Sequence, residues 1–511
     1  MGHKRSQAAL LAFMASSAIS LALTGTASAD AEKCSALAKA GLFQDTTVTL
    51  TEYLAAAGGI PARCRVVATI KPTAGSNIGV EYRLPEPPGW NGKFLGLGGG
   101  GLGGSISSTA FDGPNQRGYA AAQTDIGHTI ADGEAWALTA PGIPNADRVT
   151  DYSWRSWERM TVIGKEVVKK YYQQGAKLSY WQGCSTGGRQ GLVMAQRYPD
   201  YYDAIIAGAP VYTSRLQLRG IANNNNFYGK PGRSITPDHR TTINNAVLAA
   251  CDKKDGVVDG YLTDPRRCKW DPKSLLCSGA PNSTCLTPKQ VSSVRNYYEG
   301  PQTNDGDDIY FGVNRGGELN WDVSDNPGIG GSMARYMVFL DPNYNTKTLD
   351  INDPAVIQAW DSAAVSVEGN ADDPDIRAFL KRGGKLLLWH GFNDNGPSSL
   401  STIDYYKKVE KDVKRAKGLN PDLRNDVTES VRLFLVPGTY HCGGGPGPNS
   451  FDMLTALEQW RENNVPPKSV PASNVTSGIS RPLCPYPQVA EYDRKGNPDL
   501  AMNYRCVPGR K

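Results

Sequence analysis

Alternating and continuous apolar runs divide the first part of the chain into predicted strands and helices. Short β-rich runs separated by Gly, Pro and Asn turns fill residues 48–125, and residues 93–97 are typical of them. A helical pattern at 154–172 leads to a strand-like run at 178–181, a Gly-rich turn and a helix over 188–197. Strand, turn and helix in that order predict a β-α unit of a mostly parallel sheet.

The middle of the chain interrupts this pattern. From about residue 216 to 372 the sequence is rich in Asn, Asp, Gly and Pro, and strong strand signals return only at 385–389 and 431–436. Because both flanks carry the same alternation of strands and helices, we interpret the middle as an insertion into one core. The expected fold class is α/β, with a core over residues 30–215 and 373–511 and an inserted lid domain over 216–372.

The first residues have the pattern of a signal peptide. A positive start at residues 3–5 precedes an apolar run over 8–23, and the small residues that follow end at Ala29, where cleavage is expected. The apolar run is shorter than a membrane span, and no later segment approaches about 18 consecutive apolar residues. We therefore expect residues 1–29 to be removed and the mature protein to be secreted or periplasmic.

Charge and cysteine content narrow the partners and the chemistry. The 511 residues carry a formal net charge of +5, with 55 Lys and Arg against 50 Asp and Glu and no basic block. This mild excess predicts neither a nucleic acid nor a membrane as partner, and it leaves the oligomeric state open. The 10 cysteines, an even number in an exported chain, favour disulfides. Because no C-x-x-C pair occurs, structural zinc and a thioredoxin-like site are disfavoured.

A candidate nucleophile lies in the Gly-rich turn. Residues 183–187 read Gly-Cys-Ser-Thr-Gly, a G-x-S-x-G motif with Ser185 at its centre. In a nucleophile elbow, small residues flank the serine because the backbone is strained and packs tightly while the hydroxyl is held above the sheet. The alternative is an ordinary Ser-containing turn. The position between a strand and a helix favours the elbow, and with it an α/β-hydrolase core.

A serine nucleophile needs a histidine base, and an acid orients that base. His441 follows the 431–436 strand in a Gly-rich loop, at the edge of the sheet where the elbow is expected. His390 ends another strand but precedes the better acid candidate, Asp394. The alternative role for Asp394 is to cap the helix that begins near Ser398. The other histidines of the mature chain, His128 and His239, are interpreted as structural or surface residues.

Two cysteines flank the proposed catalytic residues. Cys184 directly precedes Ser185, and Cys442 directly follows His441. A disulfide between them would set their Cα atoms about 5.5 Å apart and so bring the serine and the histidine together. The alternative is that each cysteine pairs elsewhere.

Oxyanion stabilisation requires backbone N–H groups aimed at the developing charge. The N–H of Thr186, directly after the nucleophile, is one candidate. Gly100, in the run of glycines at 98–101, is the candidate for the second, because glycine lets the backbone approach a substrate closely. A phosphate loop is disfavoured because no G-K-[ST] follows, and a flexible turn is the remaining alternative.

A loop within the insertion has the spacing of a cation site. Asp252, Asp255 and Asp259 alternate with glycine turns between residues 251 and 261. Oxygen ligands on a flexible loop suit Ca²⁺, although the twelve-residue pattern of an EF-hand is absent. A plain acidic turn is the alternative.

Together these motifs resemble the tannase and feruloyl esterase family, which includes the mono(2-hydroxyethyl) terephthalate hydrolases. The resemblance rests on residues 183–191, His390-Gly391 with Asp394, His441-Cys442 and the 252–261 loop. It implies a Ser185, Asp394 and His441 triad supported by a Cys184–Cys442 disulfide. The further implied disulfides are Cys34–Cys64, Cys251–Cys268, Cys277–Cys285 and Cys484–Cys506. The implied structural calcium of the lid would be held by the side chains of Asp252, Asp255 and Asp259 and the carbonyls of Val257 and Tyr261.

The expected function is that of an exported serine esterase for small aromatic esters such as feruloyl, galloyl or terephthalate monoesters, working through an acyl-enzyme. In the lid, Arg335 is a candidate to meet a carboxylate or phenol and Tyr336 to flank a ring. Alternatively, this segment is an amphipathic lid helix that packs inward. A peptidase on the same triad and a catalytically silent calcium-dependent protein that binds phenolics or glycans are the other functions that the sequence allows.

Overall fold

The computed structural model describes residues 29–87, 89–322, 324–419 and 427–509. The expected signal peptide lies outside the described residues, apart from its last position, Ala29. Within the described ranges, no helix is both long enough and apolar enough to cross a membrane.

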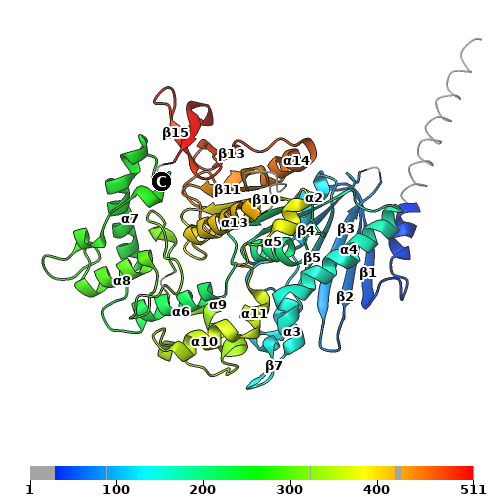
Figure 1. Ribbon diagram of the computed structural model, residues 1–511, viewed down its shortest axis with the longest axis horizontal. Helices are drawn as coiled ribbons and strands as arrows, with labels where there is room; N and C mark the ends of the chain where they lie inside the picture. The colour runs from blue at the N-terminus through cyan, green and yellow to red at the C-terminus, as the bar shows by residue number, and fades with distance from the viewer. Residues whose placement is uncertain (1–28, 88, 323, 420–426, 510–511) are drawn as a thin grey trace, which may run out of the picture.

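A nine-stranded sheet organises the chain (Figure 1), in the order β1-β2-β3-β5-β4-β8-β9-β10-β11. Its first strands pair antiparallel, and from β5 onward every neighbouring pair is parallel. The strands are β1 (Thr46–Leu54), β2 (Arg63–Ile70), β3 (Ile78–Pro85), β4 (Lys93–Leu97), β5 (Ala120–Thr124), β8 (Leu178–Cys184), β9 (Ala204–Gly208), β10 (Lys385–Gly391) and β11 (Val431–Val436). The predicted α/β-hydrolase core with its mostly parallel sheet is confirmed.

Helices cover both faces of this sheet because successive strand residues are apolar on both sides. Trp181 and Ile205 point into one core layer with α4 (Ser156–Tyr172), α5 (Thr186–Arg197) and α13 (Ser399–Leu419). Their neighbours Tyr180 and Ile206 point into the other layer, against α14 (Met453–Asn463). The parallel strands therefore end at one edge between two helical layers, which is where an α/β sheet offers a site.

The segment between β9 and β10 forms a helical region beside the sheet, drawn in green to yellow in Figure 1. It has its own apolar cluster, which includes Val247, Tyr297 and Trp321. Its helices are α6 (Arg215–Tyr228), α7 (Pro237–Cys251), α8 (Pro288–Glu299), α9 (Gly328–Met333), α10 (Pro354–Ser362) and α11 (Ala364–Gly369). The expected lid, 216–372, covers most of this segment, and its status as a separate domain stays a prediction.

Shorter elements complete the chain. They are α2 (Asp112–Gln116), β6 (Leu138–Ala140), β7 (Ile143–Pro144), α3 (Ala146–Thr150), α12 (Arg377–Lys381), β12 (Ser450–Phe451), β13 (Val470–Ser473), β14 (Ser480–Leu483), β15 (Gln488–Tyr492) and β16 (Tyr504–Pro508). The β15–β16 hairpin lies near the insertion at the end of the chain (Figure 1).

Five disulfides staple the fold, and no free cysteine remains among the described residues. The pairs are Cys34–Cys64, Cys184–Cys442, Cys251–Cys268, Cys277–Cys285 and Cys484–Cys506. These are the pairs that the family resemblance implies. Four of them close loops of 8 to 30 residues, whereas Cys184–Cys442 joins positions 258 residues apart.

Candidate active site

Ser185 lies at a sharp turn between β8 and α5. Its backbone has φ 63° and ψ −122°, a conformation that side-chain-bearing residues rarely adopt. Glycine is required on both sides, because a Cβ at Gly183 would lie 2.4 Å from the carbonyl oxygen of Gly187 and one at Gly187 would lie 2.9 Å from that of Gly99. The Ser185 N–H donates to the carbonyl of Gly208, at the end of β9, over 2.9 Å. The strained turn is therefore held by the core itself.

Asp394 and His441 come together from the ends of neighbouring strands. Asp394 follows β10 and His441 follows β11, and His441 Nδ1 lies 2.6 Å from Asp394 Oδ2. The Asp394 side chain is fully buried, whereas that of His441 is 34% exposed. Asp394 bonds to none of the first N–H groups of α13, where Ser398 accepts from Leu400 instead. The contacts of Asp394 are thus those of a histidine partner and differ from those of a helix cap.

The pKa values of this pair move apart. Burial acts to raise the pKa of Asp394, but hydrogen bonds from His390 and His441 outweigh it and hold the pKa below its ordinary value. Burial acts to lower the pKa of His441, but the hydrogen bond and the charge of Asp394 outweigh it and raise the pKa above 6.5. Asp394 is accordingly a carboxylate at neutral pH, and it favours the protonated form of His441.

A disulfide connects the turn of Ser185 to the loop of His441. The Cα atoms of Cys184 and Cys442 are 5.9 Å apart. His441 Nε2 lies 3.7 Å from the Cys442 sulfur, on the side of the ring away from Asp394. Within the part of the chain that the structure describes, no hydrogen bond joins the Ser185 hydroxyl to His441, and the disulfide links the residues directly beside them.

The other two histidines serve the local structure. The His128 ring is buried and stacks on Trp136, with ring centroids 4.1 Å apart. His239 closes the N-terminal cap of α7 with Thr236. Neither contacts Asp394 among the described residues.

The Gly-rich loop at 98–101 is anchored beside the start of α5. The Thr186 hydroxyl donates to the carbonyl of Gly101 over 2.7 Å, and the Gly99 N–H donates to Gln190 over 3.0 Å. The backbone N–H groups of Gly100 and Thr186 donate to no other group in the described residues. A Cβ at Gly100 would meet nothing within 4 Å, so this position faces open space. Both N–H groups are available to a bound oxygen.

A small cavity of about 40 Å³ adjoins Ser185. The core and the segment just after β9 line one part of its wall, and the insertion contributes Gln217, Ile329, Met333 and Val365. Arg189, in the motif after the serine, also lines it, and its guanidinium lies over the ring of Tyr152. Ligand pockets usually measure about 300–1,000 Å³, so the insertion closes tightly over this site.

Arg335 and Tyr336, the predicted substrate contacts, do not line this cavity. Arg335 Nε donates to the carbonyl of Tyr344 over 3.3 Å, and Tyr336 packs at the margin of the core. Met333 lines the cavity instead. This arrangement agrees with the alternative in which the segment packs inward through its apolar face.

The insertion also binds the loop that carries Asp394. The Asn314 side-chain amide donates to the carbonyl of Phe392 and to the Ser399 hydroxyl. Further hydrogen bonds run from Asn393 to Gly316, from Asn320 to Asn395, and from Arg219 to the carbonyls of Asn395 and Gly396. Sequence reasoning did not find these residues, because no motif or periodicity marks a contact between an insertion and a distant loop.

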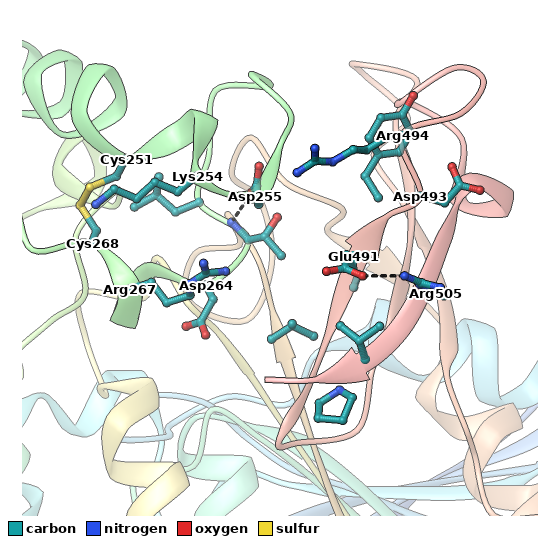
Figure 2. Close-up of a pocket in the computed structure, with 17 residues that line it drawn as sticks. Cys251, Lys254, Asp255, Asp264, Arg267, Cys268, Glu491, Asp493, Arg494 and Arg505 are labelled. Atoms are coloured by element: carbon teal, nitrogen blue, oxygen red, sulfur yellow. Dashed lines mark hydrogen bonds and ion pairs between the residues drawn. A yellow bond between two sulfur atoms is a disulfide. The ribbon is translucent and has the colours of Figure 1, made fainter. Parts of the chain in front are cut away.

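The acidic loop of the insertion forms one wall of a second cavity, of about 480 Å³, opposite the β15–β16 hairpin (Figure 2). Asp255 accepts from the Val257 N–H over 3.0 Å, and Asp252 accepts from the Gly260 N–H over 3.0 Å. Asp259 pairs with Arg481 through one oxygen, while the other is buried without a hydrogen-bond partner among the described residues.

The electrostatics of this loop fit a cation. Burial raises the pKa of Asp259 to about 6 and also raises that of Asp252, and the charge of Asp255 adds to both shifts. No group of three or more His, Cys, Asp or Glu side chains in the described ranges is arranged to hold a metal by itself. The main-chain carbonyls of Val257 and Tyr261 would therefore have to complete an oxygen shell, which is a donor set typical of Ca²⁺.

Comparison with known proteins identifies relatives along most of the chain. The family model for tannase and feruloyl esterase matches residues 64–507. A mono(2-hydroxyethyl) terephthalate hydrolase of Piscinibacter sakaiensis is 30% identical over 530 aligned positions, which cover 89% of this chain and 86% of that protein. A probable feruloyl esterase of Arthroderma benhamiae is 33% identical over 457 positions, covering 84% of this chain and 82% of that protein.

A solved structure shows the same architecture. The crystal structure of feruloyl esterase B from Aspergillus oryzae superposes with a TM-score of 0.82 at 27% identity. The superposition covers 94% of this chain and 100% of that one, so the insertion and the core both have counterparts in it.

Proposed function

Because the chain belongs to the tannase and feruloyl esterase family and is a carboxylic ester hydrolase, we propose that it cleaves aromatic esters through a catalytic triad of Ser185, His441 and Asp394. The observation that carries this proposal is the Cys184–Cys442 disulfide. It sets the strained Ser185 turn next to a histidine that is bonded to a buried carboxylate.

The proposed reaction proceeds in two steps. Ser185 Oγ attacks the ester carbonyl while His441 Nε2 takes the hydroxyl proton and passes it to the leaving alcohol, leaving an acyl-enzyme on Ser185. Water activated by the same nitrogen then releases the acid. Asp394 holds the Nδ1–H and stabilises the imidazolium, in keeping with the raised pKa of His441.

The backbone N–H groups of Gly100 and Thr186 are the proposed oxyanion donors. Both are free of other partners in the described residues, and the Thr186 hydroxyl fixes the Gly-rich loop against α5. Such preorganised donors stabilise the charge that develops on the carbonyl oxygen.

A structural calcium ion and export from the cytosol complete the proposal. The side chains of Asp252, Asp255 and Asp259 and the carbonyls of Val257 and Tyr261 would hold the ion, and the buried unpaired oxygen of Asp259 supports this. The ion would add positive charge beside the carboxylates of this loop and rigidify the insertion, away from the reacting atoms. Five disulfides support a location outside the cytosol.

The proposed acyl group is aromatic: a hydroxycinnamate, a gallate or a terephthalate monoester. The support is the apolar roof of Ile329, Met333 and Val365, together with the names of the relatives. Comparing kcat/KM for methyl ferulate, methyl gallate, mono(2-hydroxyethyl) terephthalate and p-nitrophenyl butyrate tests this proposal. We expect at least one aromatic ester to exceed the butyrate, and a preference for the butyrate would overturn the aromatic assignment. A matched amide of the best ester should remain uncleaved, and its hydrolysis would favour the peptidase alternative.

A further inference from the structure

His390, the last residue but one of β10, makes contacts that the proposed triad does not use. Its side chain is fully buried. Nε2 lies 3.1 Å from Asp394 Oδ2 and 3.0 Å from the carbonyl oxygen of Pro397, and Nδ1 lies 2.8 Å from the hydroxyl of Thr402 on α13. Asp394 therefore has a histidine on each side.

These partners determine which nitrogen carries the proton. The Pro397 carbonyl only accepts hydrogen bonds, so Nε2 must be the donor. In a neutral imidazole Nδ1 is then an acceptor, and the Thr402 hydroxyl donates to it. A doubly protonated ring would turn that hydroxyl into an acceptor and leave its own hydrogen without a described partner, although Thr402 is completely buried. The neutral tautomer satisfies every polar atom of the pair.

Hydrogen bonds hold both oxygens of the Asp394 carboxylate. His390 and His441 approach the same oxygen, Oδ2, while Oδ1 accepts from the Gly396 N–H. Three donors thus fix the rotation of the carboxylate. His390 therefore orients the carboxylate that acts on His441.

We propose that Thr402 and His390 form a hydrogen-bond relay of positioning residues that holds Asp394 Oδ2 in line with His441. Thr402 holds the ring of His390 in place through Nδ1, and His390 fixes the carboxylate. This inference rests on the proposed triad. His390 cannot replace His441 as the base, because its Nε2 faces Asp394 and Pro397 inside the core.

Substitution of Thr402 tests the relay with almost no change in volume. In Thr402→Val no hydroxyl remains to donate to Nδ1, so the His390 ring is no longer held on that side and its hydrogen bond to Asp394 Oδ2 weakens. We expect kcat to fall about tenfold, the lower end of the usual effect of such supporting groups, while KM stays within about twofold. The acid limb of the kcat/KM profile should move to lower pH, because a weaker bond to Asp394 lets the pKa of His441 fall toward its ordinary value.

Two variants provide matched controls. Thr402→Ser keeps the hydroxyl and should restore both kcat and the pH profile. Ser401→Ala removes the adjacent buried hydroxyl, which bonds to Ser398 and Tyr310. It should change stability without moving the pH profile, since it touches neither His390 nor Asp394.

Substitutions of His390 test the other member of the relay. His390→Gln retains an N–H donor for Asp394 and should keep more activity than His390→Phe, in which that donor is absent. The relay is overturned if folded Thr402→Val and Thr402→Ser share one pH profile and one kcat, or if the acid limb moves to higher pH. The proposed triad fails by a different result, namely full activity in Ser185→Ala, so the two failures are distinguishable.

Discussion

The turn of Ser185 and the loop of Asp394 are held by different parts of the molecule. The Ser185 turn is fixed by β8, β9, α5 and the glycines around it, all within the core. The Asp394 loop leaves β10 and is bound by Asn314, Asn320 and Arg219 of the insertion. The insertion therefore both covers the cavity beside Ser185 and binds the loop that carries Asp394, the proposed acid. Perturbing the insertion should therefore change catalysis through Asp394 and His441, with the nucleophile left in place.

Loss of the Ser185 hydroxyl, on the core side of the site, should reduce activity most. Ser185→Ala should fold normally and lose turnover by about 10⁶-fold, because the nucleophile of a triad cannot be replaced by its partners. Steady-state hydrolysis of the best aromatic ester measures this loss. A serine-directed organophosphonate should label Ser185, as located by peptide mass spectrometry.

Ser477→Ala, which removes an exposed serine, is the control and should leave activity and labelling unchanged. An adduct on any serine other than Ser185, or substantial turnover in Ser185→Ala, would contradict the assignment.

The next variant removes the disulfide that links the Ser185 turn to the His441 loop. Replacing both Cys184 and Cys442 by serine should lower the free energy of unfolding by about 2–5 kcal/mol, the usual range for a native disulfide. Turnover should fall as well, since no other covalent link holds the His441 loop beside Ser185. Denaturant unfolding and kcat are measured on the same preparations.

The matched control replaces both Cys277 and Cys285 by serine. Their native disulfide closes a loop of only eight residues in the insertion. It should lose less stability and keep kcat. Equal effects of the two double variants on kcat would show that the Cys184–Cys442 link has no special role.

Removal of calcium tests whether a bound ion stabilises the insertion. An ion that binds only the folded state at a hundred times its Kd stabilises that state by about 2.7 kcal/mol. A chelator should therefore lower Tm, and Asp255→Ala should show the lower Tm without responding further to the chelator. Asp307→Ala, which removes an exposed carboxylate elsewhere in the insertion, should respond as the wild type does. An unchanged Tm in chelator, together with wild-type behaviour of Asp255→Ala, would reject the ion.

Asn314 connects the insertion to the Asp394 loop, and its loss should have a smaller effect. Asn314→Ala leaves the Phe392 carbonyl and the Ser399 hydroxyl without a buried partner, which should cost about 1–3 kcal/mol of stability. We expect kcat to fall severalfold because the Asp394 loop loosens. In Asn314→Ala, the organophosphonate should still label Ser185. After correction for the ionisation of His441, the labelling rate should fall by no larger a factor than kcat.

Asn224→Ala is the control within the same insertion. Asn224 is equally buried but donates to the carbonyl of Ser324, far along the chain from the Asp394 loop. It should cost similar stability and leave kcat unchanged. A matching drop of kcat in both variants would mean that the insertion acts as a whole and not through Asn314.

The Ser185 turn and the contacts of the insertion with the Asp394 loop also differ in how far the sequence predicts them. The Ser185 turn could be predicted because strand, glycines and helix are contiguous, and backbone strain restricts which residues fit there. Asp394 and His441 could be placed because each follows a recognisable strand. Arg335 and Tyr336 were placed by residue type alone, and residue type does not determine which face of a lid helix points inward. The bonds of Asn314 and Arg219 and the contact of His390 with Thr402 depend on packing between distant segments, which no local pattern encodes.

The tight closure over Ser185 has a kinetic consequence. A cavity of about 40 Å³ holds little more than one water molecule, so an aromatic ring enters only after the roof of Ile329, Met333 and Val365 has moved. Productive encounters are then gated, and the apparent affinity equals the affinity of the open form multiplied by the fraction of molecules that are open. Substitutions that tighten this roof would raise thermal stability and slow substrate capture together. Selection for heat resistance would thus act against substrate capture at this position, whereas the disulfide-linked turn of Ser185 could be strengthened without that conflict.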